Sequence, residues 1–433
     1  MPNRPSGIGF RGSTWLDSTL GDYDYDYDYV DDYVDVRSSH MAPLAESEQD
    51  QIHITAIKVF QLKGHGIQSI CKVETDAGVY GVGEVGLPAV IARSYIEFMR
   101  DSLLGQDALA IEKCYADMTR MRAQWHAHWV QNPTISGIDM ALWDIAGKVF
   151  NRPVSKLLTG QYHDEIQLYV NVGLPRDWLD PLACRDWAQE IKADPHGFKV
   201  IKFGFEDGLR RGLPPNRSRG GWLSQMLTQT ELMIIRQGYE NCRDALGWDI
   251  DFIVHCHNEW DLPTALGIAE AVAPAKPLWI EDALPVLYSD SWRQFKMKSP
   301  VRVMTGEKLE HPAEFLQFMS NGAIDVIHPD LAFVGGITGG RKIADLAELF
   351  YIPVVTHNVG SYVQLAATAH FGASARNFVM TENRIPQGLL YEELAAEPMV
   401  VKDGKLKVPN APGLGIAVRP EVINPFLDGD QWS

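Results

Sequence analysis

The sequence predicts an α/β protein in which an N-terminal α+β domain precedes a (β/α)8-type barrel. The main observation is a repeat in the second half of the chain. There, short apolar runs end in a polar residue about every 25 residues, the length of one strand, one turn and one helix. His255, Glu281 and Glu307 are spaced by 26 residues. A β-rich segment followed by helical patterns precedes this repeat, and 433 residues suffice for two domains.

The composition excludes several classes of protein. Hydrophobic residues make up 45% of the chain and charged residues 22%, so a large core can form. A formal charge of -17 argues against a nucleic-acid-binding protein, which would have a basic face. No apolar run reaches the length of a membrane span, so we expect no membrane partner. Five scattered cysteines without a CxxC pair suit a reducing compartment, and we expect a cytoplasmic protein.

Residues 1–41 are predicted to be a tag-like or disordered tail. Asp and Tyr alternate from Asp22 to Tyr29, and this pattern cannot bury one face without burying charge. The run from Ser38 to Met41 resembles a cloning junction before a start methionine. A native acidic interaction tail is the alternative.

The N-terminal domain is expected to span residues 52–165. Two β-rich runs, Ile52 to Leu62 and Ile67 to Thr75, precede a turn and a third run from Val79 to Val85. Helical patterns follow at 88–104, 108–123 and 136–150. Strands followed by helices in this order predict an α+β domain ahead of the barrel.

The barrel is expected to span residues 166–390. Its first strand is predicted from Ile166 to Val172 and its second from Val200 to Phe203, and the later strands end at the repeating polar residues. An irregular Arg-rich segment, 209–221, follows the second strand. It is compatible with a lid that grips an anion, with a solvated loop or with an oligomer contact. Residues 391–433 are expected to pack back on the N-terminal domain.

The polar residues at the strand ends identify the candidate site. In (β/α)8 barrels, catalytic side chains project from the C-terminal ends of the strands. The repeat continues, less evenly, to the polar residues of the last three strands, which are Asp330, His357 and Glu382. The spacing therefore predicts an enzyme and the place of its active site.

Six motifs give the chain a resemblance to a known family. In order they are Ser136-Gly-Ile-Asp-Met-Ala-Leu-Trp-Asp-Ile-Ala-Gly-Lys148, Trp279-Ile-Glu-Asp282, Thr305-Gly-Glu307, His328-Pro-Asp330, Gly335-Gly-Ile-Thr338 and Thr356-His-Asn358. Over residues 52–418 the chain resembles the mandelate racemase-like acid-sugar dehydratases of the enolase superfamily. The resemblance implies a capping domain over a modified (β/α)7β barrel, a divalent metal held by strands three to five, and a His–Asp dyad on strands six and seven.

Glu281 and Glu307 are the predicted metal ligands, because two carboxylates on neighbouring strands suit a hard cation such as Mg²⁺. Pairing with Lys or Arg on adjacent strands is the alternative.

At His255 the sequence departs from the family, which normally has an Asp ligand there, and imidazole suits Zn, Fe or Ni better than Mg²⁺. His255 either ligates a divalent cation other than Mg²⁺, leaves the cation with two carboxylates and water, or marks lost activity. We favour ligation, although Asn258 or Glu259 could supply an oxygen instead.

The resemblance implies roles for His357, Asp330 and His257. Asp330 would orient the imidazole of His357, which would remove the proton α to the substrate carboxylate. His257 lies two residues beyond His255 and would face the same side if the strand continued. It would then protonate a leaving hydroxyl, and the alternative is a histidine hydrogen-bonded at the strand end.

Two further residues complete the candidate site. Lys202 is expected to stabilise developing negative charge. The family often has a second lysine two residues later, but this chain has Gly204 there, so the opposite face has no visible base. Glu382 would hydrogen-bond the carboxylate oxygen of the intermediate.

The expected function is metal-dependent dehydration of a sugar acid to a 2-keto-3-deoxy sugar acid, by removal of the α-proton and elimination of the β-hydroxyl. A racemase or epimerase of a 2-hydroxy acid, with His257 as second base, is one alternative. A non-catalytic acid-sugar-binding relative is another. The turn from Lys63 to Gly66 and the segment from Arg122 to Trp129 are expected to select the substrate, or the latter packs between the domains. The resemblance also implies a homo-oligomer.

Overall fold

The computed structural model describes residues 52–433 except 65–67, 126–131, 159, 207–208, 210–225 and 386–392. The predicted tail, residues 1–41, therefore lies outside the described residues. The described strands form two sheets, a four-stranded antiparallel sheet and a larger sheet that closes into a barrel. None of the described helices is long and apolar enough to cross a membrane.

The N-terminal sheet is an antiparallel meander in the order β14-β1-β2-β3. Its strands are β1 (Ile54–Leu62), β2 (Ser69–Thr75) and β3 (Tyr80–Val85). The helices that follow are α1 (Ala89–Leu103), α2 (Ile111–Trp125), α3 (Asn132–Val149) and the short α4 (Val154–Leu157). The meander and the three long helices correspond to the runs predicted from the sequence.

Helix α3 lies directly against β3, and two strand glycines make this contact possible. A Cβ atom added at Gly81 would lie 1.9 Å from the carbonyl oxygen of Ala141, and one at Gly83 would lie 1.9 Å from that of Gly137. Any larger residue at either position would separate the helix from the sheet. The helix that carries the Ser136-to-Lys148 motif is fixed in this way on the N-terminal sheet.

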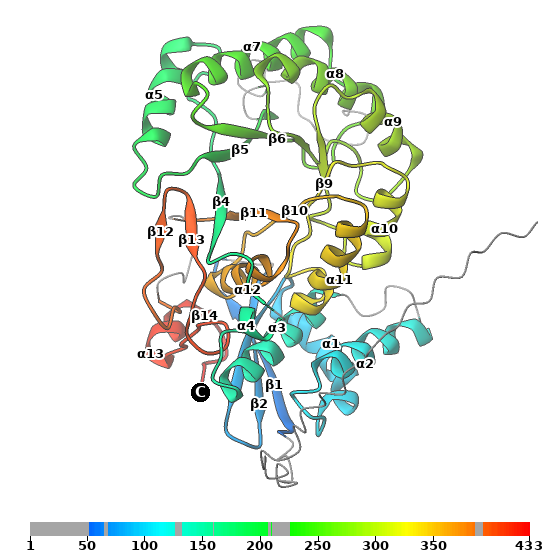
Figure 1. Cartoon of the computed structure of the whole chain (residues 1–433), viewed down its shortest axis with the longest axis vertical. Coiled ribbons are helices and arrows are strands. Elements are labelled where there is room, and N and C mark those ends of the chain that lie inside the picture. Colours follow the sequence, from blue (N-terminus) through cyan, green and yellow to red (C-terminus); the bar gives the residue numbers. More distant parts are fainter. Residues whose placement is uncertain are drawn as a thin grey trace, which may run out of the picture. The chain divides into compact units, whose positions relative to one another are not determined.

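The second sheet has ten described strands, eight of which are parallel and form a closed barrel. The chain order is β4 (Glu165–Asn171), α5 (Pro181–Lys192), β5 (Val200–Gly204), α7 (Gln229–Leu246), β6 (Asp251–His255), α8 (Leu262–Val272), β7 (Ile280–Glu281), α9 (Asp290–Lys298), β8 (Val303–Thr305), α10 (Pro312–Ser320), β9 (Val326–Ile327), α11 (Gly336–Leu349), β10 (Val354–Thr356), α12 (Tyr362–Ser374) and β11 (Phe378–Asn383). Pairing of β11 with β4 closes the ring, and the helices lie outside it (Figure 1). Seven strands are each followed by a described barrel helix and β11 is not, so the predicted (β/α)7β fold is confirmed.

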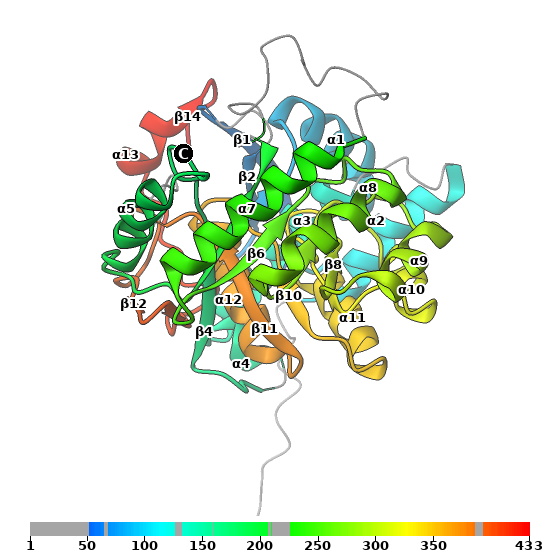
Figure 2. The same ribbon diagram turned by 90° about the horizontal axis from the view of Figure 1, so that it is seen from above.

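The C-terminal segment, expected at 391–433 to pack on the N-terminal domain, contacts both parts of the protein. The hairpin of β12 (Val401–Lys402) and β13 (Lys405–Lys407) pairs antiparallel with β4 of the barrel. After α13 (Pro420–Ile423), β14 (Leu427–Asp428) pairs antiparallel with β1, and Figure 2 shows this end of the chain beside the N-terminal sheet. The segment therefore joins the two sheets.

Buried carboxylates also join the N-terminal domain to the barrel. Asp139 of α3 accepts a hydrogen bond from Thr338 N at the start of α11, at 3.0 Å. Glu84 of β3 accepts hydrogen bonds from the backbone nitrogens of Ser361 and Gln364 at the start of α12. Burial raises the pKa of both carboxyl groups to about 7, although these donors oppose the rise.

The Asp139→Asn variant should show how this burial makes stability depend on pH. The carboxyl pKa is about 7 in the folded chain and near 3.8 in the unfolded chain, so between these values only the unfolded state is ionised. The contribution of Asp139 to stability is therefore lost as pH rises from about 4 to 7, on the order of 4 kcal/mol. Urea unfolding between pH 4 and 8 should give the variant a flatter profile than the wild type. The matched control is Asp101→Asn, because Asp101 is an exposed residue of α1. Parallel stability profiles of the wild type and Asp139→Asn would contradict the prediction.

Candidate active site

The barrel interior has two layers at its C-terminal end. The apolar layer consists of Val200, Ile253, Trp279, Val326, Val355 and Met380, which with Tyr169 and Met304 form one buried cluster. The polar layer lies two residues further along the chain from each of these six residues, on the same side. It consists of Lys202, His255, Glu281, His328, His357 and Glu382. On β8 the equivalent of these residues is Glu307, which follows Met304 by three residues because Gly306, at φ 135°, interrupts the alternation.

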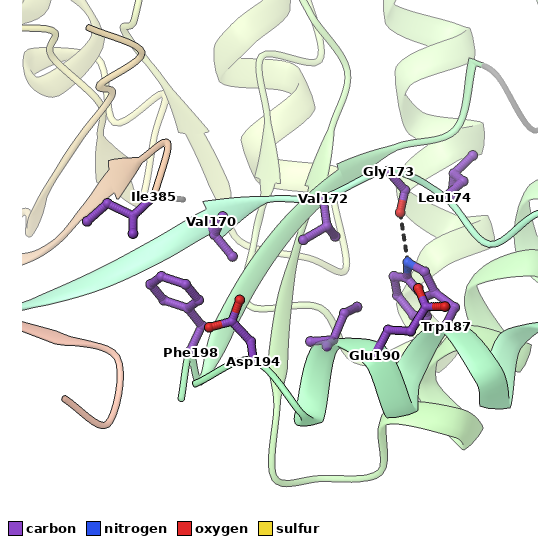
Figure 3. A pocket seen from close by; sticks show the side chains of 10 residues that line it. Val170, Val172, Gly173, Leu174, Trp187, Glu190, Asp194, Phe198 and Ile385 are labelled. Carbon is purple, nitrogen blue, oxygen red and sulfur yellow. Dashed lines mark hydrogen bonds between the residues drawn. The ribbon is translucent and has the colours of Figure 1, made fainter. Parts of the chain in front are cut away.

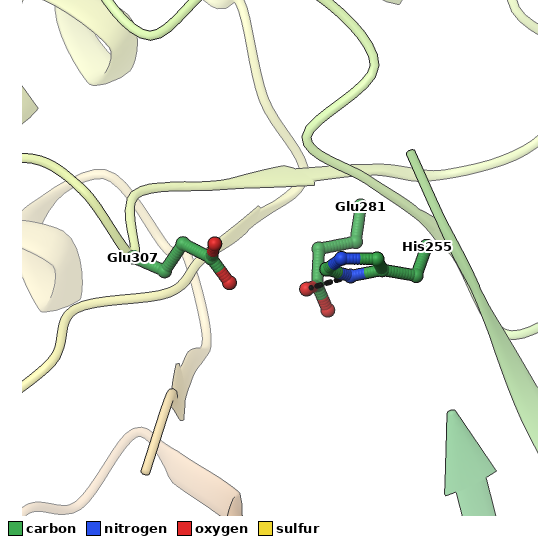
Figure 4. A group of neighbouring side chains, drawn as sticks. All are labelled: His255, Glu281 and Glu307. Atoms are coloured by element: carbon green, nitrogen blue, oxygen red, sulfur yellow. Dashed lines mark hydrogen bonds and ion pairs between the residues drawn. The ribbon is translucent and has the colours of Figure 1, made fainter. Parts of the chain in front are cut away.

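His255, Glu281 and Glu307 form a compact group of candidate ligands (Figure 4). Their ligand atoms all lie within 4.8 Å of one another. His255 Nδ1 lies 2.8 Å from Oε1 of Glu281, and the Lys308 ammonium group lies 2.5 Å from Oε1 of Glu307. The Oε2 atoms of both glutamates are buried and have no hydrogen-bond partner among the described residues. Each glutamate thus has one oxygen held and one oxygen available, which fits monodentate binding of a divalent cation.

Charges around the two glutamates keep both of them ionised. Burial opposes ionisation of Glu281, but the charge of Lys202 and the hydrogen bond with His255 outweigh it and lower the pKa of this carboxyl group below its ordinary value. For Glu307, burial is outweighed mainly by His357 and Lys202, and its pKa is also lowered. Two carboxylates that are charged at neutral pH match the charge of a divalent cation.

His357 and Asp330 form the expected dyad. His357 Nδ1 lies 2.6 Å from Oδ2 of Asp330, and the two residues also form a β-bridge. The other ring nitrogen, Nε2, lies 3.5 Å from Oε2 of Glu307 and 3.7 Å from Oε2 of Glu382. Burial alone would lower the pKa of His357, but Glu307, Glu382 and Asp330 raise it to about 9. A cation that neutralised the charge of Glu307 would remove the largest contribution that raises the pKa of His357. The ring would then be unprotonated, and able to accept a proton, nearer to pH 7.

A buried network connects the dyad side of the barrel to the glutamates. Lys202 Nζ lies 2.9 Å from both Oε1 of Glu281 and Oε2 of Glu382. Burial would lower the pKa of Lys202, but Glu281 and Glu382 raise it above its ordinary value, so this side chain is a cation. Tyr169 donates a hydrogen bond to Glu382 at 3.2 Å, and its hydroxyl lies 2.8 Å from Nε2 of His328.

Tyr169, His328, Lys308 and Gln364 contact the predicted site residues but were not predicted. Burial lowers the pKa of His328 to about 3, so its ring is neutral. The signal for His328 was present, because it follows Val326 by the same two residues that separate Val355 from His357. The sequence signal for the other three is weaker, since it is the folded backbone that brings them to the site.

The third strand does not continue through His257, so the condition for His257 to face the same side as His255 along a strand is not met. Strand β6 ends at His255, and His257 and Asn258 follow in left-handed conformations with φ of 59° and 63°. The turn nevertheless brings the rings of His255 and His257 within 4.7 Å, centre to centre. Burial, together with the charges of His255 and Lys308, lowers the pKa of His257. Asn258 does not join the ligand group, because its amide contacts Lys308 at 2.7 Å and the carbonyl oxygen of Leu284.

Contacts among the described residues thus join all eight predicted site residues. The predicted specificity elements and the Arg-rich segment 209–221 lie mostly outside the described residues, which exclude 65–67, 210–225 and the side chains from Met121 to Gln131. A pocket of about 350 Å³ between β4 and α5 is separate from this site (Figure 3). Val170 and Val172 line it, whereas Tyr169 on the opposite side of β4 contacts Glu382.

Comparison with known proteins identifies relatives over most of the chain. A family model described as mandelate racemase / muconate lactonizing enzyme, N-terminal domain matches residues 60–159, and one described as enolase C-terminal domain-like matches residues 184–422. The D-xylonate dehydratase of Haloferax volcanii is 28% identical over 379 residues, which cover 86% of this chain and 89% of that enzyme. The D-gluconate dehydratase of Thermoproteus tenax is 27% identical over 361 residues, which cover 82% of this chain and 69% of that enzyme.

The fold comparison gives the same relationship. The crystal structure of the 3,6-anhydro-D-galactonate cycloisomerase from Zobellia galactanivorans aligns with a TM-score of 0.73 at 25% identity. The alignment covers 87% of this chain and 100% of that chain. The similarity therefore includes both the N-terminal domain and the barrel.

The His255→Asp variant should change the preference among divalent cations. A third carboxylate adds an oxygen ligand and a negative charge beside Glu281, so Mg²⁺ affinity should rise about tenfold or more relative to Mn²⁺ and Zn²⁺. Calorimetric titration of metal-free protein with each cation measures this ratio. His257→Asp is the matched control, because it adds the same charge outside the ligand group. An unchanged ratio in His255→Asp would show that position 255 does not face the cation.

Proposed function

The chain belongs to the mandelate racemase/muconate lactonizing enzyme family of the enolase superfamily, and we propose that it is a metal-dependent dehydratase of a sugar acid. One observation carries the proposal: Nε2 of His357, the ring nitrogen that Asp330 does not hold, lies 3.5 Å from Oε2 of Glu307 in the candidate cation site. A base beside a candidate cation site suits the removal of a proton from a carbon next to a carboxylate. The names of the two dehydratase relatives support a sugar acid as the substrate class.

The cation would be held by Glu281 and Glu307, with His255 as the third candidate ligand. When bound, it would stabilise negative charge on the substrate carboxylate. Magnesium is typical of the family, while the imidazole at position 255 favours a cation of more borderline character. The side chains in the barrel provide the remaining steps.

His357 takes the α-proton at Nε2, and the electron pair of the broken C–H bond moves into the carboxylate to give an enediolate. Asp330 holds the ring orientation and stabilises the imidazolium that forms. The ammonium group of Lys202 and the carboxyl group of Glu382 lie 2.9 Å apart in the same layer. The ammonium group of Lys202 donates hydrogen bonds to the growing charge, and Glu382 holds this ammonium group in place. Glu382 itself can donate to the intermediate only in its protonated form.

Elimination then breaks the β-carbon–oxygen bond as the electron pair of the enediolate returns. The hydroxyl group leaves as water after receiving a proton, and the resulting enol becomes a 2-keto-3-deoxy acid. We assign this proton to His257, which lies beside His255 and is exposed, so that its ring can take up a proton from solvent before it donates. The protonated His357 is the second candidate, because its raised pKa makes it a stable carrier of the proton that it has just accepted.

An epimerase would need a second base on the opposite face of the substrate. Gly204 occupies the position where the family places that lysine, and a Cβ there would lie 2.5 Å from Glu206. The described residues therefore offer His257 alone for this role, and a single strongly basic histidine favours elimination over inversion.

His357→Asn should abolish dehydration and leave the cation site intact. Asn cannot accept the α-proton, so turnover of the active sugar acid should fall by about 10²- to 10⁴-fold. Formation of 2-keto acid from a panel of aldonates measures turnover, and calorimetry with Mn²⁺ measures binding. His196→Asn, a surface histidine paired with Asp194, serves as the control. Wild-type turnover in His357→Asn would remove it from the mechanism.

His257→Asn in D2O should separate proton removal from hydroxyl loss. If His257 supplies the proton, the variant should still exchange the α-hydrogen of the substrate for deuterium, while 2-keto acid formation falls at least about 10²-fold. Mass spectrometry and NMR of recovered substrate measure exchange and configuration. Undiminished dehydration would transfer the acid role to His357. Recovery of inverted, deuterated substrate from the wild type would instead identify an epimerase.

A further inference from the structure

The segment that carries the proposed base is held by the N-terminal domain at two places. Gln68, the residue before β2, donates from its side-chain amide to the carbonyl oxygen of Val359, at 2.9 Å. Glu84 of β3 accepts from Ser361 Oγ at 2.6 Å and from Gln364 N at 3.1 Å. These contacts lie in the chain directly after His357 and reach the first turn of α12.

Gln364 extends this contact to the dyad itself. Its side-chain amide donates to Oδ1 of Asp330 at 2.6 Å, and Ala332 N donates to the same oxygen at 2.7 Å. The other oxygen, Oδ2, is the one that holds His357 Nδ1. Both oxygens of the Asp330 carboxylate are therefore occupied, so the carboxylate cannot rotate without breaking a buried hydrogen bond.

The N-terminal domain and the barrel are tightly packed around Gly360. A Cβ added at Gly360 would lie 2.1 Å from Oε1 of Gln364 and 2.7 Å from Oε1 of Glu84. Gln364 is 1% exposed and Glu84 is 0% exposed. Glu84 thus fixes the backbone of the residue whose side chain fixes Asp330.

We propose that Gln364 is a positioning residue for the His357–Asp330 dyad and that Glu84 acts through it. Docking of the N-terminal domain then sets the orientation of the catalytic imidazole. The proposal rests on the proposed function, because orientation of His357 matters for catalysis only if this ring removes the α-proton. A misdirected ring nitrogen lowers the rate of proton transfer without changing how the substrate or the cation binds.

Gln364→Met tests the first step, because methionine keeps the length of the side chain and removes the donor. We expect kcat to fall about 10- to 100-fold, with KM and the Mn²⁺ binding stoichiometry close to wild type. Thr368→Val is the matched control on the same helix. Thr368 is equally buried, and its hydroxyl has no hydrogen-bond partner among the described side chains and backbone. Wild-type kcat in Gln364→Met, or an equal loss in Thr368→Val, would overturn the positioning role.

A double-mutant cycle tests whether Glu84 acts through Gln364. Glu84→Met should lower kcat, and Glu84→Gln, which keeps an acceptor oxygen, should recover most of that loss. In the Glu84→Met/Gln364→Met double variant the two losses should not multiply, because both substitutions release the same carboxylate. Multiplicative losses would show that Glu84 acts independently of Gln364.

A readout without turnover separates this proposal from the proposed function. The proton shared by His357 Nδ1 and Asp330 should give a far-downfield proton NMR signal, assigned by its loss in His357→Asn. In folded Gln364→Met this signal should shift or broaden, and in Thr368→Val it should not. If no sugar acid is dehydrated by the wild type, the proposed function fails while this result still decides the positioning role. An unchanged signal in Gln364→Met would overturn the role even in an active enzyme.

Discussion

Compensation of buried negative charge at the mouth of the barrel is the constraint on which the rest of the structure depends. Glu281, Glu307, Glu382 and Asp330 are all nearly inaccessible to solvent, and an isolated buried carboxylate would be protonated at neutral pH. The strands instead bring cations to them: Lys202 lies between Glu281 and Glu382, and Lys308 lies beside Glu307. Breaking one of these pairs would leave an uncompensated charge in the core, so the arrangement of the layer is strongly constrained.

Some buried carboxylate oxygens in this layer have no hydrogen-bond partner within the described part of the chain, and these oxygens indicate function. Oε2 of Glu281, Oε2 of Glu307 and Oε1 of Glu382 are buried without a hydrogen-bond partner among the residues described by the structure. Most buried polar atoms in folded proteins are paired, and a purely structural ion-pair network would pair these as well. Three carboxylate oxygens without a hydrogen-bond partner in the described ranges, at the C-terminal ends of barrel strands, are what a site for a cation and a charged substrate requires.

The parts of the site that the sequence predicted depend on strand period, and the parts that it missed depend on local backbone conformation. A repeat of one strand and one helix assigns Glu281, His357 and Glu382 to strand ends on the same side of a barrel. The period cannot show that Gly306 breaks the alternation on β8, so that Glu307 and the next residue, Lys308, contact each other. Gln364 was missed for a related reason: its contact with Asp330 forms only when α12 packs against the barrel, and no spacing in the sequence encodes it.

His255 also affects the balance of charge around the buried glutamates. It engages Oε1 of Glu281 together with Lys202, and it leaves Oε2 available. An Asp at this position would add a third carboxylate beside a cation and a substrate that becomes more negative as its α-proton leaves. An imidazole adds no negative charge, so it lowers the repulsion that the enediolate of the proposed reaction would experience, at the expense of affinity for a hard cation. The departure from the family pattern is therefore compatible with the proposed reaction, which would itself add negative charge to the site.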